Sequence, residues 1–271
     1  TRGYIAIPAL SGVGVNLNSN LLSVDNFLYK HNGEVVTALH SSVDADKFLG
    51  RLPQIGFVGV NLNANILGAG FYTKNSFWNF GINLRSSNDI TLSKDVFKVL
   101  KTLSNGHYDL NNTSISSTSY LELYVGNTRK VADFSFGTLT AGAKVKILAG
   151  LLNASSQIEQ MYADISSESV KGELQGTLRA SGVIFDPTKG VAGQEITEDV
   201  LCYDVNQIFG NLKNFGAAID LGAELTLLDD HLRLSAAVTD LGFIKWSKST
   251  YIEAETVCNF YYNGINLNSG E

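Results

Sequence analysis

Six charged residues are the candidates for chemistry in this chain, because each lies on the polar side of a segment in which apolar and polar residues alternate. Around Asp220, every second residue from Phe215 to Leu227 is apolar, which is typical of a β-strand with two unlike faces. Charges on the inner wall of a pore can select solutes, or they can pair with one another and hold the wall together. The sequence leaves both roles open. The six residues are Arg85, Lys144, Lys146, Asp220, Glu224 and Arg233.

Other kinds of chemistry find little support. The four histidines are scattered, and no two have the spacing of metal ligands. No nucleophile elbow and no glycine-rich phosphate loop is present. Carboxylates on neighbouring strands would suit a glycosidase, but no cleft-forming loop supports that interpretation. We therefore expect no enzyme activity, no catalytic residue, no metal and no cofactor. The net charge of −6 argues against nucleic acid as a partner.

The segments that carry these charges predict unusually long β-hairpins. Residues 215–228 and 232–246 alternate over most of their length and are joined by only three residues, whereas strands average about 5–6 residues in soluble proteins. No run approaches the roughly 18 apolar residues of a transmembrane helix. Length and facing together favour an all-β protein, an antiparallel up-and-down transmembrane β-barrel with apolar residues toward lipid and polar residues toward the lumen.

The whole chain, residues 1–271, is predicted as one barrel domain of about ten or eleven strands. Short connections at 73–76, 127–133, 166–171 and 229–231 are expected on one rim, which bacterial barrels turn to the periplasm. Two long connections, Ser86–Thr113 and the acidic Asp186–Asn211, would lie outside the cell. The predicted strands include Tyr4–Leu17, Val35–His40, Gly56–Tyr72, Phe77–Arg85, Tyr120–Gly126, Phe134–Leu151, Gln157–Ile165, Glu173–Phe185 and Thr250–Tyr262.

One helix is predicted, over Lys94–Asn105 within the first long connection. Ser93 has the character of an N-cap and Gly106 that of a stop. Its apolar residues form a single stripe, so the helix is expected to pack over the barrel mouth as a plug or lid. The stripe consists of Val96, Phe97, Val99, Leu100 and Leu103.

Asp240 conflicts with the facing of its own strand. The apolar positions Leu232 to Val238 lead by steps of two to Asp240, and a carboxylate facing lipid is unfavourable. A β-bulge within Asp240–Gly242 is therefore predicted, with glycine permitting the backbone conformation. The bulge would turn Asp240 toward the lumen or the rim and leave Trp246 at the membrane interface. These roles of Asp240, Gly242 and Trp246 are structural.

The end of the chain makes a poor closing strand. Residues 265–271 are polar, and a closed bacterial barrel normally has an even number of strands, so we expect the sequence to be incomplete at its C-terminus. Cys202 and Cys258 could form a disulfide in an oxidising compartment or remain two free thiols.

Two motifs resemble a known family. The segment Asp240–Trp246 (DLGFIKW) and the opening Gly3–Leu10 (GYIAIPAL) are similar to an uncharacterised outer-membrane barrel family of Bacteroidota. That family is loosely similar to accessory barrels of type IX secretion and gliding motility and to fatty-acid-transporter-like barrels. The resemblance covers most of the chain and implies a place in the outer membrane of a Gram-negative bacterium, with the lipid bilayer as its surroundings. It transfers no functional residue.

Three function classes remain. A porin-like channel or carrier for a small solute is favoured. The alternative is a non-transporting scaffold that docks a secretion or surface-protein partner through its long loops. A soluble, lipocalin-like carrier would have the opposite facing, with its apolar side chains inside.

Overall fold

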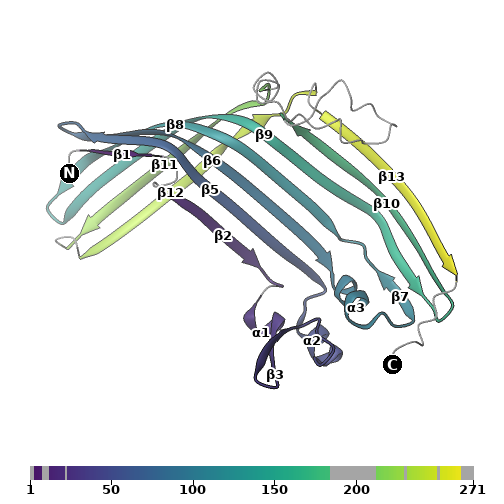
Figure 1. Ribbon diagram of the computed structural model, residues 1–271. Helices are drawn as coiled ribbons and strands as arrows, with labels where there is room; N and C mark the ends of the chain where they lie inside the picture. Colours follow the sequence, from purple (N-terminus) through teal and green to yellow (C-terminus); the bar gives the residue numbers. More distant parts are fainter. Residues whose placement is uncertain are drawn as a thin grey trace.

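The structure, a computed structural model, describes residues 3–7, 12–21, 23–183, 212–228, 231–248 and 251–263. Apart from three short helices, the regular elements in these residues are β-strands, which confirms the all-β class. Eleven strands form one antiparallel sheet, and a two-stranded hairpin stands apart from it (Figure 1). No helix in the described ranges is both long and apolar enough to cross a membrane.

Four long strands form the middle of the sheet in up-and-down order. Each pairs with the next in antiparallel register. Along the free side of the first of them lie two short strands end to end, β1 (Gly3–Ala6) and β2 (Val13–Ser19). The four long strands are β5 (Ile55–Tyr72), β6 (Ser76–Ser93), β8 (Ser114–Phe134) and β9 (Gly137–Ile165).

The longest strand, β9, has two partners end to end along one edge. Residues 137–149 pair with β11 and residues 152–165 pair with β10. Beyond these partners lie β12 and β13, while β7 pairs with the end of β9 on its other edge. These strands are β7 (Gly106–Asp109), β10 (Ser169–Gly182), β11 (Phe215–Leu227), β12 (Leu232–Lys245) and β13 (Tyr251–Asn263).

The separate strands predicted at 134–151 and 157–165 are thus one strand of 29 residues. The polar stretch between them stays extended because it pairs on both sides, with β8 and with β10. Leu151 is an extra residue opposite the step from Ser119 to Tyr120. This bulge shifts the alternation of faces along β9 by one residue, so that inward positions are even-numbered up to Gly150 and odd-numbered beyond Leu152.

The described strands form an open, strongly curved sheet (Figure 1). Its edges are β1 and β2 on one side and β12 and β13 on the other, and no pairing among the described residues joins them. Barrel closure therefore remains a prediction.

The predicted rims need correction. The β5–β6, β8–β9 and β11–β12 connections lie at one end of the sheet, but the β9–β10 turn at 166–168 lies at the other end, where β7 and α3 (Lys94–Thr102) are found. The prediction failed because it divided β9 into two strands. A single strand places the next turn at the opposite end of the sheet. In addition, β8 runs on to Phe134, so the predicted turn at 127–133 is strand with a bulge at Val131.

The predicted loop Ser86–Thr113 is mostly regular structure. β6 continues to Ser93, which caps α3 by accepting a hydrogen bond from the backbone N–H of Asp95. The helix ends at Thr102, and its C-cap is Leu103, whose φ is 40°, and not Gly106. Phe97 is buried, but Leu100 is 62% exposed and Leu103 is also exposed. The prediction that the whole stripe packs was wrong.

Between Leu17 and about Pro53 the sequence predicts only one short strand, Val35–His40, yet the described residues of this region form a compact unit with α3. We call it the helical cluster. Its core contains Leu21, Phe48 and Phe97, and the rings of Phe27, Phe48 and Phe97 meet edge to face. Its elements are α1 (Val24–Phe27), β3 (Leu28–His31), β4 (Glu34–Thr37) and α2 (Ala45–Arg51).

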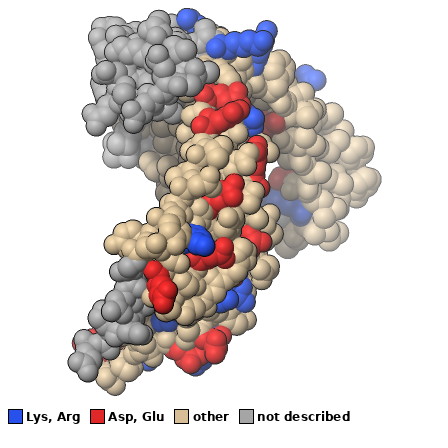
Figure 2. Space-filling view, turned by 90° about the vertical axis from the view of Figure 1, so that its right-hand side faces the viewer, with Lys and Arg blue, Asp and Glu red and all other residues tan. Residues whose placement is uncertain are grey.

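The two ends of the sheet expose different surfaces. The hairpin half comprises β11, β12, β9 up to Ala149, and the parts of β5, β6 and β8 beside them; one of its faces is apolar and uncovered. On that face Ile147 is 56% exposed and Phe243 is 68% exposed. In the other half, β10 and β13 carry charged side chains at the surface (Figure 2), including the Arg179–Glu253 ion pair.

Candidate functional site

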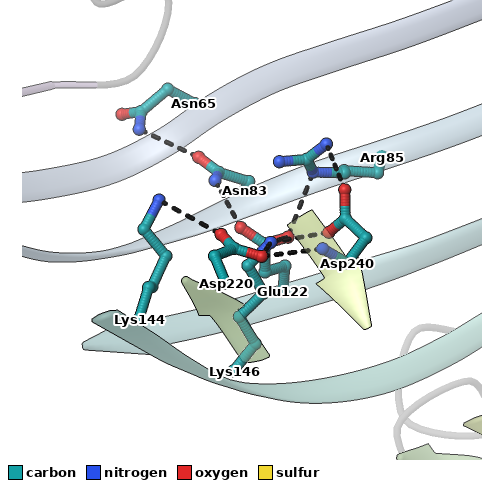
Figure 3. A network of polar contacts seen from close by, with 8 residues as sticks. All are labelled: Asn65, Asn83, Arg85, Glu122, Lys144, Lys146, Asp220 and Asp240. Atoms are coloured by element: carbon teal, nitrogen blue, oxygen red, sulfur yellow. Dashed lines mark hydrogen bonds and ion pairs between the residues drawn. The ribbon is translucent and has the colours of Figure 1, made fainter. Parts of the chain in front are cut away.

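Charged and amide side chains from six strands meet on the polar face of the hairpin half (Figure 3). We call this group the ion network. It combines three cations with three carboxylates and two asparagines. Its members are Asn65, Asn83, Arg85, Glu122, Lys144, Lys146, Asp220 and Asp240.

Lys146 is the centre of the ion network, and its side chain is only 1% exposed. Its Nζ lies 2.7 Å from Oδ1 of Asp220, 2.6 Å from Oδ1 of Asp240 and 3.5 Å from Oε2 of Glu122. A buried ammonium group is costly unless it is paired and hydrogen-bonded. These carboxylates supply that pairing from three different strands.

Glu122 is completely buried and links the centre to the next two strands. Nε of Arg85 lies 3.1 Å from its Oε2. Nδ2 of Asn83 donates to its Oε1 at 2.9 Å, and Nδ2 of Asn65 donates to Oδ1 of Asn83 at the same distance. The contacts therefore run without a break from β5 to β12.

The ion network shows how the sheet curves. Arg85 is on β6 and Asp240 is on β12, with β8, β9 and β11 between them. Four strand spacings in a flat sheet would separate them by about 19 Å. Nη1 of Arg85 nevertheless lies 3.8 Å from Oδ2 of Asp240. The sheet must curl toward its polar face, which leaves the apolar face on the outside of the curve.

A β-bulge at Thr239–Asp240 places the carboxylate of Asp240. Ile219 is opposite Leu241 and Leu221 is opposite Val238, so two residues of β12 face the single residue Asp220. The φ of Asp240 is 58°, and its backbone N–H donates to Oδ1 of Asp220 at 2.8 Å.

This bulge includes Asp240, as the sequence predicts, but it lies at Thr239–Asp240 instead of within Asp240–Gly242, and its conformation is not the expected one. Asp240 itself is left-handed, whereas Gly242 sits in the regular ladder opposite Ala218. The extra residue shifts the phase of β12. The outward apolar series that ends at Val238 therefore continues at Leu241 and Phe243, both exposed.

The structure brings together four of the six predicted charges, namely Arg85, Lys144, Lys146 and Asp220. Glu224 and Arg233 lie farther toward the turn on the same face, opposite Ser235 and Thr226. Neither makes an ion pair within the described part of the chain.

Sequence reasoning missed Glu122, Asn83 and Asn65. The sequence held a signal for Glu122, because this charged residue stands between the apolar residues Leu121 and Leu123. Its partner, however, lies 37 residues away on β6.

The interface prediction required Trp246 to be among the outward residues, but it is not. Its ring lies over Gly150, where an added Cβ would be 2.7 Å from the ring. Gly150 is opposite Tyr120 and follows Lys146 and Leu148 on the polar face of β9. The missing side chain at Gly150 makes room for the indole ring. Cys258 is exposed on β13, while Cys202 and Asp186–Asn211 lie outside the described residues.

Next to the ion network, toward the turns, the polar face is hollowed. We call this cavity of about 470 Å³ the polar hollow. Lys144 lies at the end of the hollow next to the ion network, with its Nζ 4.5 Å from the centre of the Tyr124 ring. Most of its other lining residues are small or polar and include Asn79, Thr128, Thr140, Asp220, Glu224, Ser235 and Thr239.

This arrangement can hold a curved wall together and can offer charges to a solute. Among the described residues there is no group of three or more His, Cys, Asp or Glu side chains suited to a metal ion. The network carboxylates already have cationic partners, so Glu224 is the carboxylate of the hollow that is open to a ligand.

These features define a curved antiparallel sheet protein with charges inside the curve and an uncovered apolar face outside. The chain belongs to a protein family of unknown function, DUF5723, whose family model matches residues 1–271. No curated protein and no solved structure matches it.

Proposed function

We propose that this protein is a β-barrel protein of the outer membrane of a Gram-negative bacterium of the Bacteroidota, and that it is a channel or carrier for a small solute. One observation carries the proposal. The contact between Arg85 and Asp240 curls five strands around a charged interior. A curl of that sense suits a barrel with a polar lumen and a lipid-facing exterior.

The apolar outer face supports a membrane location. Soluble monomers rarely expose contiguous apolar patches larger than a few hundred Å², yet this face continues across β5, β6, β8, β9, β11 and β12. Residues 137–149 of β9 pair with β11 throughout and would be about 44 Å long at roughly 3.4 Å per residue. Tilted by about 45°, they would span about 31 Å, close to the roughly 30 Å hydrocarbon core. The rest of β9 and the helical cluster would then stand outside the bilayer.

The polar hollow supports transport, because it offers a solute polar groups of both charges next to the lumen wall. The test is reconstitution into lipid vesicles followed by swelling in isotonic solutions of small solutes. Vesicles with the protein should swell in a small amino acid or sugar and not in a large dextran. Protease protection should establish in the same samples that the protein has inserted.

A non-transporting scaffold is the second candidate, and one observation favours it. Glu122 and Lys146 are almost completely buried, so the interior is tightly packed at their level. A barrel closed there would serve as an anchor, and exposed residues of the helical cluster such as Leu39 and Val35 could meet a protein partner. Insertion without any swelling would overturn transport and leave this role.

A further inference from the structure

The two ends of the polar hollow carry opposite charges, and each of these charges can still bind a group of a ligand. Nζ of Lys144 lies 3.9 Å from Oδ2 of Asp220, whereas Lys146 holds the same carboxylate at 2.7 Å. Lys144 is thus only weakly engaged and can donate to an anionic group. At the other end, Glu224 lines the hollow and has no ion-pair partner within the described ranges. Arg233 is opposite Thr226, one inward pair farther on, and does not line the hollow.

The floor between these charges is open to a ligand. Gly142 is opposite Gly222, and a Cβ added at Gly222 would meet no atom closer than 3.6 Å. The walls offer the hydroxyl groups of Thr140 and Ser235. They also offer the side chain of Asn79.

The separation of the charges sets the size of the ligand. Asp220, beside Lys144, and Glu224 are four residues apart on β11, which corresponds to about 14 Å. An extended peptide spans at most about 3.3–3.6 Å per residue, so two to four residues fit. A cavity of this volume is typical of small-molecule sites. A neutral sugar would use the hydroxyl groups but leave both charges without partners.

We propose that the polar hollow binds a short peptide of two to four residues with free termini, its α-carboxylate at Lys144 and its α-ammonium group at Glu224. The inference rests on the proposed transport function only in naming the class of solute. Amide groups of the peptide meet the hydroxyl groups and Asn79 along the floor.

The test is calorimetric titration of the protein in detergent micelles with trialanine. Lys144→Met and Glu224→Gln should each weaken binding about tenfold, the lower end for a hydrogen bond to a charged group. Gly222→Trp should abolish binding, because the ring fills the open space on the floor. The matched controls lie in the other half of the sheet. Lys171→Met, which removes a lysine stacked on Tyr261, and Glu255→Gln should leave binding unchanged.

Blocked peptides assign the two ends. Glu224→Gln should not change the affinity for N-acetyl-trialanine, and Lys144→Met should not change that for trialanine amide. Equal binding of blocked and free peptides by the unmodified protein, or no binding of trialanine, would overturn the inference. Binding in micelles needs no transport, so bound trialanine without vesicle swelling would uphold this site and overturn transport alone. Swelling with other small solutes without any binding of trialanine would overturn this site and uphold transport.

Discussion

Replacing Lys146 by methionine should cost about 3 kcal/mol of folding free energy. Removal of one partner from a buried ion pair typically costs about 3–5 kcal/mol. The lower end applies because the side chain of Asp240 is 44% exposed and water can solvate it. The ion network would change from three cations and three carboxylates to two cations and three carboxylates. Methionine keeps most of the volume, so the loss comes from charge and not from a cavity.

The assay is equilibrium unfolding by urea in lipid vesicles, with two comparison proteins. The double variant Lys146→Met/Glu122→Gln restores the balance of charge and should recover at least half of the loss. Lys130→Met removes an exposed partner of Asp133 and should cost less than about 1 kcal/mol. If Lys146→Met costs no more than Lys130→Met, the ion network does not hold the curl of the sheet.

Three further outcomes follow from the faces and the packing. Leu221→Arg should weaken folding into vesicles by about 2–4 kcal/mol if its face meets lipid, while Gly222→Ser should leave the folding free energy nearly unchanged. Equal costs of the two substitutions in a urea titration would refute the assigned faces. Phe97→Ala should cost about 3–5 kcal/mol and Leu100→Asp less than about 0.5 kcal/mol, because only the first side chain is buried; comparable losses of amide protection would contradict this. Gly150→Val should cost about 1–3 kcal/mol and change the fluorescence of the neighbouring indole, and an unchanged spectrum would refute the contact.

The strands could be predicted because a period of two is a local property. The conflict at Asp240 was also readable, since a carboxylate in an apolar series requires a change of phase. Which residue adopts the left-handed conformation was not readable. Gly242 has the greater conformational freedom, but the contacts of Asp240 with Asp220 and Lys146 decide the matter.

The missed features depend on contacts between distant residues. The helical cluster is built on Phe27, Phe48 and Phe97, and the last of these joins it from another part of the chain. The continuity of β9 depends on its two neighbours, because its middle stretch alternates weakly. Neither feature leaves a signal within a short window of sequence. The sequence therefore predicted a single short strand in the first region and two separate strands in place of β9.

The end-to-end placement of β10 and β11 gives the sheet a natural place for insertions. Gly182 is opposite Leu152 and Phe215 is opposite Ala149, so the connecting sequence leaves and rejoins the edge of β9 almost at the same point. Its length can change without altering the register of any strand, and doubling the length of a connection costs only about 0.6 kcal/mol. A reporter domain or an affinity tag could be spliced there, and chains of quite different length could share one unchanged sheet.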